Sequence, residues 1–220
     1  PCSAGNSIKS LASAGGYTAA SCDPDYYSII NKSGIIINKI YCEQGWRSDL
    51  VHIKPWYAGT LVTAEEKNVS YYATSYNMAN GNKNSQYLAE SRLEAIVSTG
   101  NEDVFFIYSS TSNTHICNIG FWAVSSIKYF GGTYKSSCPG PDDFMIVATS
   151  SKLVRYNPDN YDYYILQSGQ ADHVAYDPAN NNVIYTKGKT LYVMDIETET
   201  NLDNVSFNKK ILGVFCVNNK

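Results

Sequence analysis

The sequence lacks the features of several common protein classes. No apolar run approaches the ~18 residues that a membrane-spanning helix needs. Charged residues make up only 17% of the 220 residues and the net charge is −3, so the chain has neither a basic footprint for nucleic acid nor a polybasic segment for anionic lipid. We therefore expect no nucleic-acid partner and no membrane insertion.

Motifs for catalysis, metals and cofactors are also missing. The sequence contains no HExxH, GxSxG, GxGxxG, P-loop or EF-hand pattern. Asn157, Asp159 and Asp162 could offer oxygen ligands to Ca²⁺, but Asp, Asn and Pro are also what ordinary turns use. Three histidines alternate with apolar neighbours, which is typical of strand faces: His52, His115 and His173. We expect no metal and no cofactor, and we favour a protein that is not an enzyme.

The cysteines and the glycosylation sequons indicate the compartment. The six cysteines are an even number, and none lies in a Cys-x-x-Cys motif. Sequons of the form Asn-x-Ser begin at Asn31, Asn68 and Asn204. Paired cysteines together with sequons are typical of secreted proteins. We therefore expect an extracellular, glycosylated, disulfide-bonded chain, mature and processed, that begins at Pro1 next to Cys2.

Short apolar and aromatic runs bounded by Gly, Asn, Asp and Pro dominate the chain and predict an all-β fold. Tyr occurs 19 times against 7 Phe, which suits half-buried strands. The best helix candidate is 85–97, whose end is equally typical of a strand. The runs that predict strands include 26–31, 34–42, 59–63, 69–76, 94–99, 103–110, 143–150, 152–157, 163–168 and 210–217.

The chain shows self-similarity over a long offset. GGYTAASC (15–22) returns as GGTYKSSC (131–138), and AGTLVTAEEKNVSYY (58–72) resembles ADHVAYDPANNNVIY (171–185). CSAG (2–5) likewise precedes CNIG (117–120) at nearly the same spacing. The shared order of these matches predicts a tandem duplication with halves 1–116 and 117–220.

A shorter unit recurs within each half. DPDYYSIINKSGIIINKIYCE (23–43) and DPANNNVIYTKGKTLYVMDIE (177–197) both run from an Asp-Pro elbow through a strand and a tight turn into a second strand. A period near 40 residues with several strands per repeat is typical of β-propellers. We predict one compact domain over 1–220, a propeller of six short blades in a 3+3 arrangement.

The run 177–198 resembles one blade of the YWTD/NHL-like six-bladed β-propellers. Ile184-Tyr185-Thr186 stands where that family has Tyr-Trp-Thr, Asp177-Pro178 precedes it, and Tyr192–Asp195 ends the second strand. A rival resemblance covers 21–46, which is similar to the second half of a sushi module. That module needs a further cysteine soon after Trp46, and the next one is Cys117.

The duplication also suggests how the cysteines pair. Cys2 matches Cys117 and Cys22 matches Cys138, so bonds 2–22 and 117–138 would be equivalent. Cys42 and Cys216 would then pair and close the propeller ring, which otherwise ends in two free edges. A sushi module implies the bond 2–42 instead.

The function that these patterns favour is binding rather than catalysis. We expect a secreted protein that recognises a protein or a carbohydrate through propeller loops, and self-assembly remains open. Alternatives are a propeller hydrolase or lactonase-like enzyme with a central metal, tandem sushi-like modules in adhesion or immune modulation, and a structural subunit of an extracellular matrix or filament. The candidate ligand-binding residues are loop aromatics: Trp46, Trp56, Tyr57, Tyr161 and Tyr163.

Overall fold

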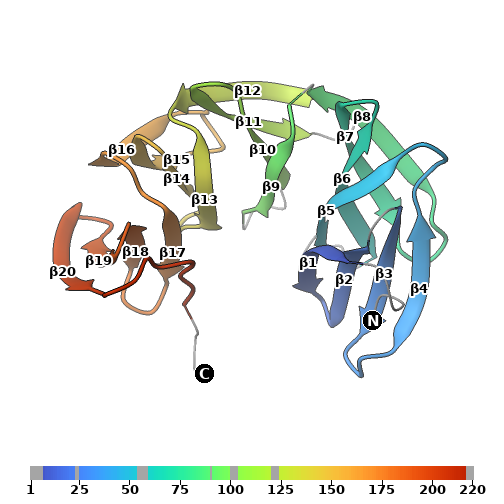
Figure 1. Cartoon of the computed structure of the whole chain (residues 1–220), viewed down its shortest axis with the longest axis horizontal. Helices are drawn as coiled ribbons and strands as arrows, with labels where there is room; N and C mark the ends of the chain where they lie inside the picture. Colours follow the sequence, from blue (N-terminus) through green and yellow to red (C-terminus); the bar gives the residue numbers. More distant parts are fainter. Residues whose placement is uncertain are drawn as a thin grey trace. The chain divides into compact units, whose positions relative to one another are not determined.

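The computed structural model describes residues 7–22, 25–53, 59–89, 91–99, 104–119 and 124–216. All regular elements in these residues are β-strands, arranged as five four-stranded sheets (Figure 1). In every strand pair whose register is known the two strands are antiparallel. None of the described residues forms a helix with the length and apolarity of a membrane span. The predicted all-β class is confirmed.

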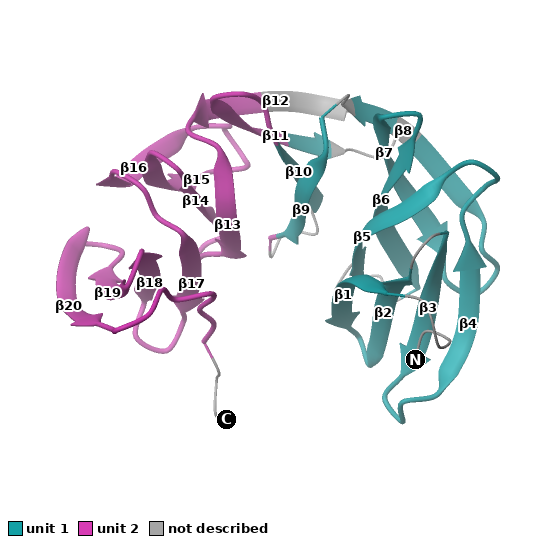
Figure 2. Cartoon of the chain, in the orientation of Figure 1, with its two compact units in different colours: residues 1–98, 102–108, 117–125 teal, residues 99–101, 109–116, 126–220 magenta. Residues whose placement is uncertain are grey.

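Contacts divide the chain into two compact units, coloured in Figure 2. Unit 1 comprises residues 1–98, 102–108 and 117–125, and unit 2 comprises residues 99–101, 109–116 and 126–220. The sheet of β9 (Leu93–Ser98), β10 (Val104–Ser109), β11 (Asn113–Ile119) and β12 (Val124–Gly131) contains residues of both units. The other four sheets each belong to one unit.

Unit 1 holds two complete sheets that follow the chain order. Its buried residues include a cluster around Tyr27, Ile53 and Tyr76, another around Leu93 and Phe106, and a small one of Ala20, Cys22 and Tyr26. The strands are β1 (Ile8–Ala14), β2 (Tyr17–Cys22), β3 (Tyr26–Asn31), β4 (Ile36–Tyr41), β5 (Arg47–Ile53), β6 (Thr60–Lys67), β7 (Ser70–Asn77) and β8 (Lys83–Ala89). Strands β2, β3 and β6 have consecutive buried residues, so both of their faces are covered, whereas exposed positions alternate with less exposed ones along β1 and β4.

Unit 2 holds the other two complete sheets. Its core gathers around Ile146, Leu153, Val183 and Tyr185, each at most 1% exposed. All five residues of β14 are buried, because the run MIVAT faces apolar neighbours on both sides of its sheet. The strands are β13 (Tyr134–Pro139), β14 (Met145–Thr149), β15 (Lys152–Tyr156), β16 (Tyr163–Ser168), β17 (His173–Asp177), β18 (Asn182–Lys187), β19 (Thr190–Asp195) and β20 (Thr200–Ser206).

Most sequence-predicted strands are confirmed, and two match at both ends: 26–31 is β3 and 163–168 is β16. The helix candidate 85–97 instead covers parts of β8 and β9. The predicted strand 210–217 is wrong for its described residues. Ile211 N donates to Gly188 O at 3.2 Å, but no ladder follows, because β20 already occupies the free edge of β19.

The matched segments of the predicted duplication occupy different strand positions. GGYTAASC ends in β2, the second strand of its sheet, whereas GGTYKSSC leads into β13, the first strand of its sheet. Residues 58–72 likewise span β6 and part of β7, whereas 171–185 span β17 and part of β18. The duplication and the count of six blades therefore stay predictions.

The expectation that disulfides close the ring is not supported. Cys42, Cys117, Cys138 and Cys216 are free thiols, so the predicted bonds 117–138 and 42–216 and the sushi-type bond 2–42 are absent. Each of the first three packs with a different core cluster, Cys42 and Cys117 in unit 1 and Cys138 in unit 2. Cys22 is disulfide-bonded. Its predicted partner Cys2 lies outside the described residues, so the bond 2–22 stays a prediction.

Candidate functional site

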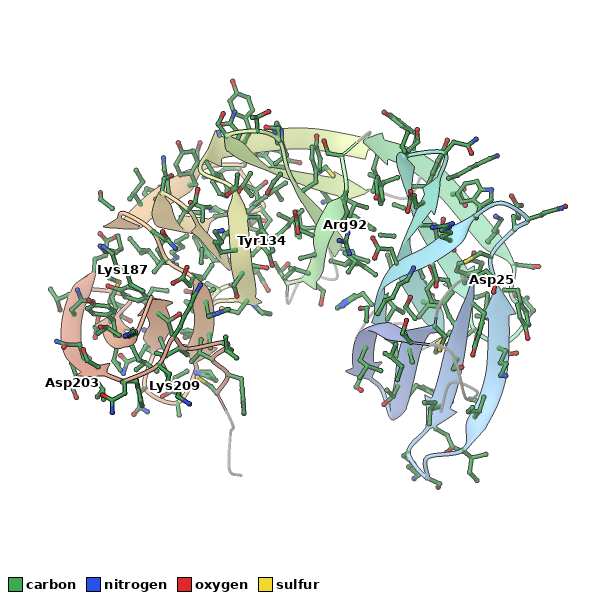
Figure 3. The ribbon with its side chains drawn as sticks, in the orientation of Figure 1. Asp25, Arg92, Tyr134, Lys187, Asp203 and Lys209 are labelled. Atoms are coloured by element: carbon green, nitrogen blue, oxygen red, sulfur yellow. The ribbon has the colours of Figure 1, made fainter. Side chains whose placement is uncertain are left out.

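A cavity of about 460 Å³ lies in unit 2 between strand β13, strand β17 and the C-terminal segment, by which we mean residues 207–216. Figure 3 labels Tyr134 on β13 and Lys209 on the C-terminal segment. The volume falls within the roughly 300–1,000 Å³ of typical ligand pockets. The residues that line it are Ser136, Ser137, Cys138, Pro139, Val174, Ala175, Tyr176, Pro178, Val214, Phe215 and Cys216.

Hydrogen bonds position the walls of this cavity. Strands β13 and β17 are the first strands of neighbouring sheets in the chain, and the backbone N–H of Val174 donates to the hydroxyl of Ser136 at 3.3 Å. The third wall begins where Phe207 N donates to Lys189 O at 2.9 Å, followed by the bond from Ile211 to Gly188. The C-terminal segment therefore starts from the turn between β18 and β19 and ends at the cavity.

The lining contains hydroxyl groups, and hydrogen bonds to other groups of the protein fix their orientation. The hydroxyl of Tyr176 donates to Asn181 Oδ1 at 2.7 Å, and Asn181 Nδ2 donates to Glu197 Oε1 at 2.8 Å. The hydroxyls of Tyr134 and Ser137 lie 3.0 Å apart. Burial, followed by the nearby Asp142 carboxylate, raises the pKa of Tyr176. Its phenol is therefore neutral at physiological pH and fixes the position of the ring.

The two thiols of the lining are also uncharged at neutral pH. Burial raises the pKa of Cys138 to about 12, and the neighbouring Cys216 adds to this rise. The pKa of Cys216 is raised by burial and then by Asp177. Since the described lining contains no acidic, basic or imidazole side chain, the cavity suits an uncharged ligand surface.

The C-terminal segment carries large apolar side chains that are exposed. Phe215 lines it and is 81% exposed, and Leu212, three residues earlier, is 86% exposed. Pro139 at the end of β13 and Pro178 just after β17 contribute rigid apolar surface to the lining. Exposed apolar residues that cluster beside a concavity are typical of protein interaction sites.

Trp46, a predicted ligand-binding residue, is instead part of the packing of unit 1. It is only 8% exposed, and its ring lies 4.6 Å from that of Tyr72. The ammonium groups of Lys83 and Lys67 lie 4.8 Å and 5.2 Å from its centroid. Neighbours therefore cover the faces that a sugar ring would need. The predicted Trp56 and Tyr57 lie outside the described residues.

The tyrosines of the 157–164 tract have different environments. Tyr161 sits in the turn before β16 with a φ of 61° and is 37% exposed. Tyr163 packs its ring 5.3 Å from Phe130, with Lys128 and Lys152 about 6 Å from its centroid. Neither residue lines the cavity, although both belong to the same unit.

The acidic tract predicted as an alternative calcium loop forms ordinary turns. Asn157 Oδ1 accepts from Asp159 N at 2.9 Å, and Asn160 Oδ1 accepts from Asp162 N at 3.0 Å. These side-chain oxygens cap backbone amides, as Asx-turns do. No group of three or more His, Cys, Asp or Glu side chains suited to a metal occurs among the described residues.

The histidines lie on strands, as the alternation of their neighbours predicts: His52 on β5, His115 on β11 and His173 on β17. His115 Nε2 lies 2.9 Å from the hydroxyl of Ser110, and burial lowers the pKa of His115. The Ser110 hydroxyl also lies 3.5 Å from the carbonyl of Asn113 within the same hairpin. These contacts fit a hairpin that is held together locally.

The three predicted glycosylation sites differ in accessibility. Asn68 is exposed in the β6–β7 turn, and Asn204 is exposed on β20. Asn31 is half-buried at the end of β3, where its Oδ1 accepts from the backbone N–H groups of Ser33 and Ile35 at 3.0 Å each. The side-chain amides of Asn68 and Asn204 are therefore more accessible for glycosylation than that of Asn31.

Two of the stretches that line the cavity stand out in the sequence, although no ligand-binding role was predicted for them. GGTYKSSC supplies Ser136–Cys138 on β13, and DHVAYDP supplies Val174–Pro178 around β17. Both stretches belong to the repeat segments, and the repeat pattern predicts strands but not which of their residues line a cavity. Phe215 belongs to the run that predicted a strand, so its exposure could not be foreseen.

Comparisons with known proteins identify the fold. No protein-family model and no curated protein matches the chain. Its structure is similar to the β-propeller domain of Cps50 (Swd1) from Myceliophteria thermophila, with 10% identity, a TM-score of 0.68 and coverage of 92% of this chain and 74% of that one. It is also similar to a protein of unknown function from Bacteroides caccae, with 14% identity, a TM-score of 0.61 and coverage of 98% and 88%.

These likenesses define the class of protein as a β-propeller. The meander order of the complete four-stranded sheets agrees with propeller blades. Membership of the YWTD/NHL-like group stays a prediction, since the similarity in structure extends to propellers with little sequence in common. Because propellers host many activities, the function has to be argued from the cavity itself.

Proposed function

We propose that this chain is an extracellular, non-enzymatic binding protein that recognises a protein partner at the cavity of unit 2. The observation that carries the proposal is Phe215, a large apolar side chain that is 81% exposed on the wall of an uncharged cavity. Holding such a side chain in water costs free energy that a partner recovers by covering it. Aromatic residues at a concavity are frequent anchors of protein interfaces.

The other walls support recognition of an extended peptide segment. Pro139, Pro178 and Tyr176 offer apolar faces, while Ser137 offers a hydroxyl. A few oriented polar groups within an apolar lining are what a selective, uncharged binding site needs. Exposure of Asn68 and Asn204 is compatible with the predicted glycosylated, extracellular chain.

Selection from a random-peptide library tests this proposal. Peptides enriched on the purified chain are measured for their Kd with the wild type, with Phe215→Ala, and with Tyr164→Ala as matched control. Tyr164 is 55% exposed on β16 and does not line the cavity. We expect Phe215→Ala to weaken binding by about tenfold or more and the control to leave Kd unchanged. Enrichment of no peptide, or equal Kd values for both variants, would contradict the proposal.

Carbohydrate binding is a second candidate function, favoured by the exposed tyrosines at the start of β16. Tyr161 and Tyr164 are 37% and 55% exposed, and their rings could stack on a sugar. A glycan array probed with the wild type and with Tyr161→Ala tests this candidate. Glycan binding that Tyr161→Ala removes and Phe215→Ala leaves intact would favour it over the peptide site.

A further inference from the structure

Two free thiols from distant parts of the chain meet at the cavity of unit 2. Cys138 on β13 and Cys216 on the C-terminal segment are 78 positions apart in sequence, and both line this cavity. Both are free and half-buried, so neither is sealed in the core. Burial, and then the charge of Cys216, raises the pKa of the Cys138 thiol.

The remaining free cysteines are engaged elsewhere. The thiol of Cys117 is buried in the core of unit 1 and donates to the carbonyl of Phe106 at 3.4 Å. The thiol of Cys42 donates to the Glu65 carboxylate at 3.5 Å, also in unit 1. Within the part of the chain that the structure describes, Cys138 and Cys216 are therefore the two free thiols that share one lining.

We propose that Cys138 and Cys216 form a disulfide bond, which fastens the C-terminal segment to β13. This pairing replaces the predicted bonds 117–138 and 42–216. It is independent of any ligand, since it requires only the two thiols and a low-molecular-weight disulfide such as oxidised glutathione. An extracellular chain would meet such an oxidising environment.

The chemistry is thiol–disulfide exchange in two steps. The Cys216 thiolate, having lost its proton to solvent, attacks one sulfur of oxidised glutathione and releases the other half as a glutathione thiolate. The Cys138 thiolate then attacks the Cys216 sulfur of the mixed disulfide and releases the second glutathione. Two protein thiols are oxidised and one glutathione disulfide is reduced to two thiols, so electrons and protons balance.

The bond would secure a weakly held part of the fold. Among the described residues, Ile211 is the last in the C-terminal segment whose backbone makes a hydrogen bond. Beyond it the chain contributes Val214, Phe215 and Cys216 to the cavity wall. A cross-link at Cys216 closes a long loop and fixes this wall, so we expect the melting temperature to rise by roughly 5–15 °C.

Peptide mass spectrometry of the native chain after exposure to oxidised glutathione tests the bond. We expect a linked peptide pair containing Cys138 and Cys216, lost in Cys138→Ser and in Cys216→Ser. Cys138→Ser should retain one glutathione on Cys216, because the resolving thiol is gone. Cys42→Ser is the matched control: its hydroxyl can still donate to Glu65, and the 138–216 link should survive.

The same experiment can overturn the inference. Links 117–138 or 42–216, or loss of the Cys216 link in Cys42→Ser, would restore the sequence-based pairing. Absence of a 138–216 link under full oxidation of the folded chain would exclude the bond. If the link forms, an equal melting temperature for the oxidised wild type and for Cys138→Ser would show that the disulfide does not stabilise the fold.

Discussion

The hydroxyl of Tyr76 donates a hydrogen bond of 2.5 Å to the carboxylate of Glu65 inside unit 1. Glu65 is 0% exposed and accepts two further bonds, from Thr74 Oγ1 at 3.1 Å and from Cys42 Sγ at 3.5 Å. A buried carboxylate is tolerated when such donors replace its lost water. Strands β6 and β7 and the end of β4 thus converge on one polar group within an apolar core.

Tyr76→Phe should destabilise the fold by about 2–3 kcal/mol, because Glu65 would lose its shortest donor while staying buried. Urea unfolding at neutral pH measures the change. Tyr41→Phe is the matched control, since Tyr41 is 63% exposed on β4. A loss below about 0.5 kcal/mol for Tyr76→Phe would show that the Glu65 bond adds little to stability.

The stability of the chain should fall as the pH rises above about 10, the pKa of tyrosine in an unfolded chain. Burial, reinforced by the Glu65 charge, raises the pKa of both Tyr27 and Tyr76 well above this value. Their phenols stay protonated in the folded state while unfolded tyrosines ionise, so each contributes a fall of up to about 1.4 kcal/mol per pH unit. Urea midpoints from pH 9 to 11 check this. Tyr76→Phe should show a shallower fall, and identical slopes would contradict the assignment.

Asp172→Asn should destabilise unit 2 by about 1.5–3 kcal/mol at neutral pH. Asp172 is 5% exposed, and its carboxylate accepts from Gly188 N at 2.7 Å and from Gln170 Nε2 at 2.5 Å. Burial alone would raise its pKa, but these bonds, with Lys210 and His173 nearby, lower the pKa below the usual range.

The Asp172 contribution is present above about pH 4 and is lost as the pH falls through the lowered pKa. The difference in stability between the wild type and Asp172→Asn should therefore shrink below pH 4, as measured by thermal unfolding. Asp159→Asn, in an exposed turn, is the matched control. A difference that does not change with pH would rule out the charge as its source.

Val69→Gly should stabilise the fold by about 1 kcal/mol. Asn68 and Val69 have φ values of 50° and 61° in the tight turn between β6 and β7, and Val69 is 73% exposed. A β-branched residue is strained at such a φ, whereas Asn-Gly is the favoured pair for this turn. The substitution keeps the Asn68 sequon, so glycosylation does not confound the melting temperature. Val205→Gly on β20 is the control and should destabilise slightly.

Residues whose role is local could be predicted from the sequence. The strand YYSIIN and the Lys-Gly-Lys turn before β19 depend on neighbours a few positions away, and both are found as predicted. The acidic tract forms the turns that its Asp and Asn residues favour. All-β class and propeller architecture follow from such local patterns because each sheet is built from consecutive strands.

The candidate site could not be predicted, because it depends on contacts across many residues. Residues 210–216 cannot pair with β19, because β20 occupies that edge, and Phe215 lies outside any strand and is exposed. Trp46 is of a residue type that can stack on a ligand, but Tyr72 and two lysines cover its ring. The predicted cysteine pairs assumed equivalent positions for β2 and β13, and these strands differ in their place within the sheet.

Hydrogen–deuterium exchange of the chain with and without a selected peptide tests the binding site most directly. The account predicts that added protection concentrates in 136–139, 174–178 and 211–216, the three walls of the cavity. Protection confined to 157–164, around Tyr161, or to strands of unit 1 would contradict it.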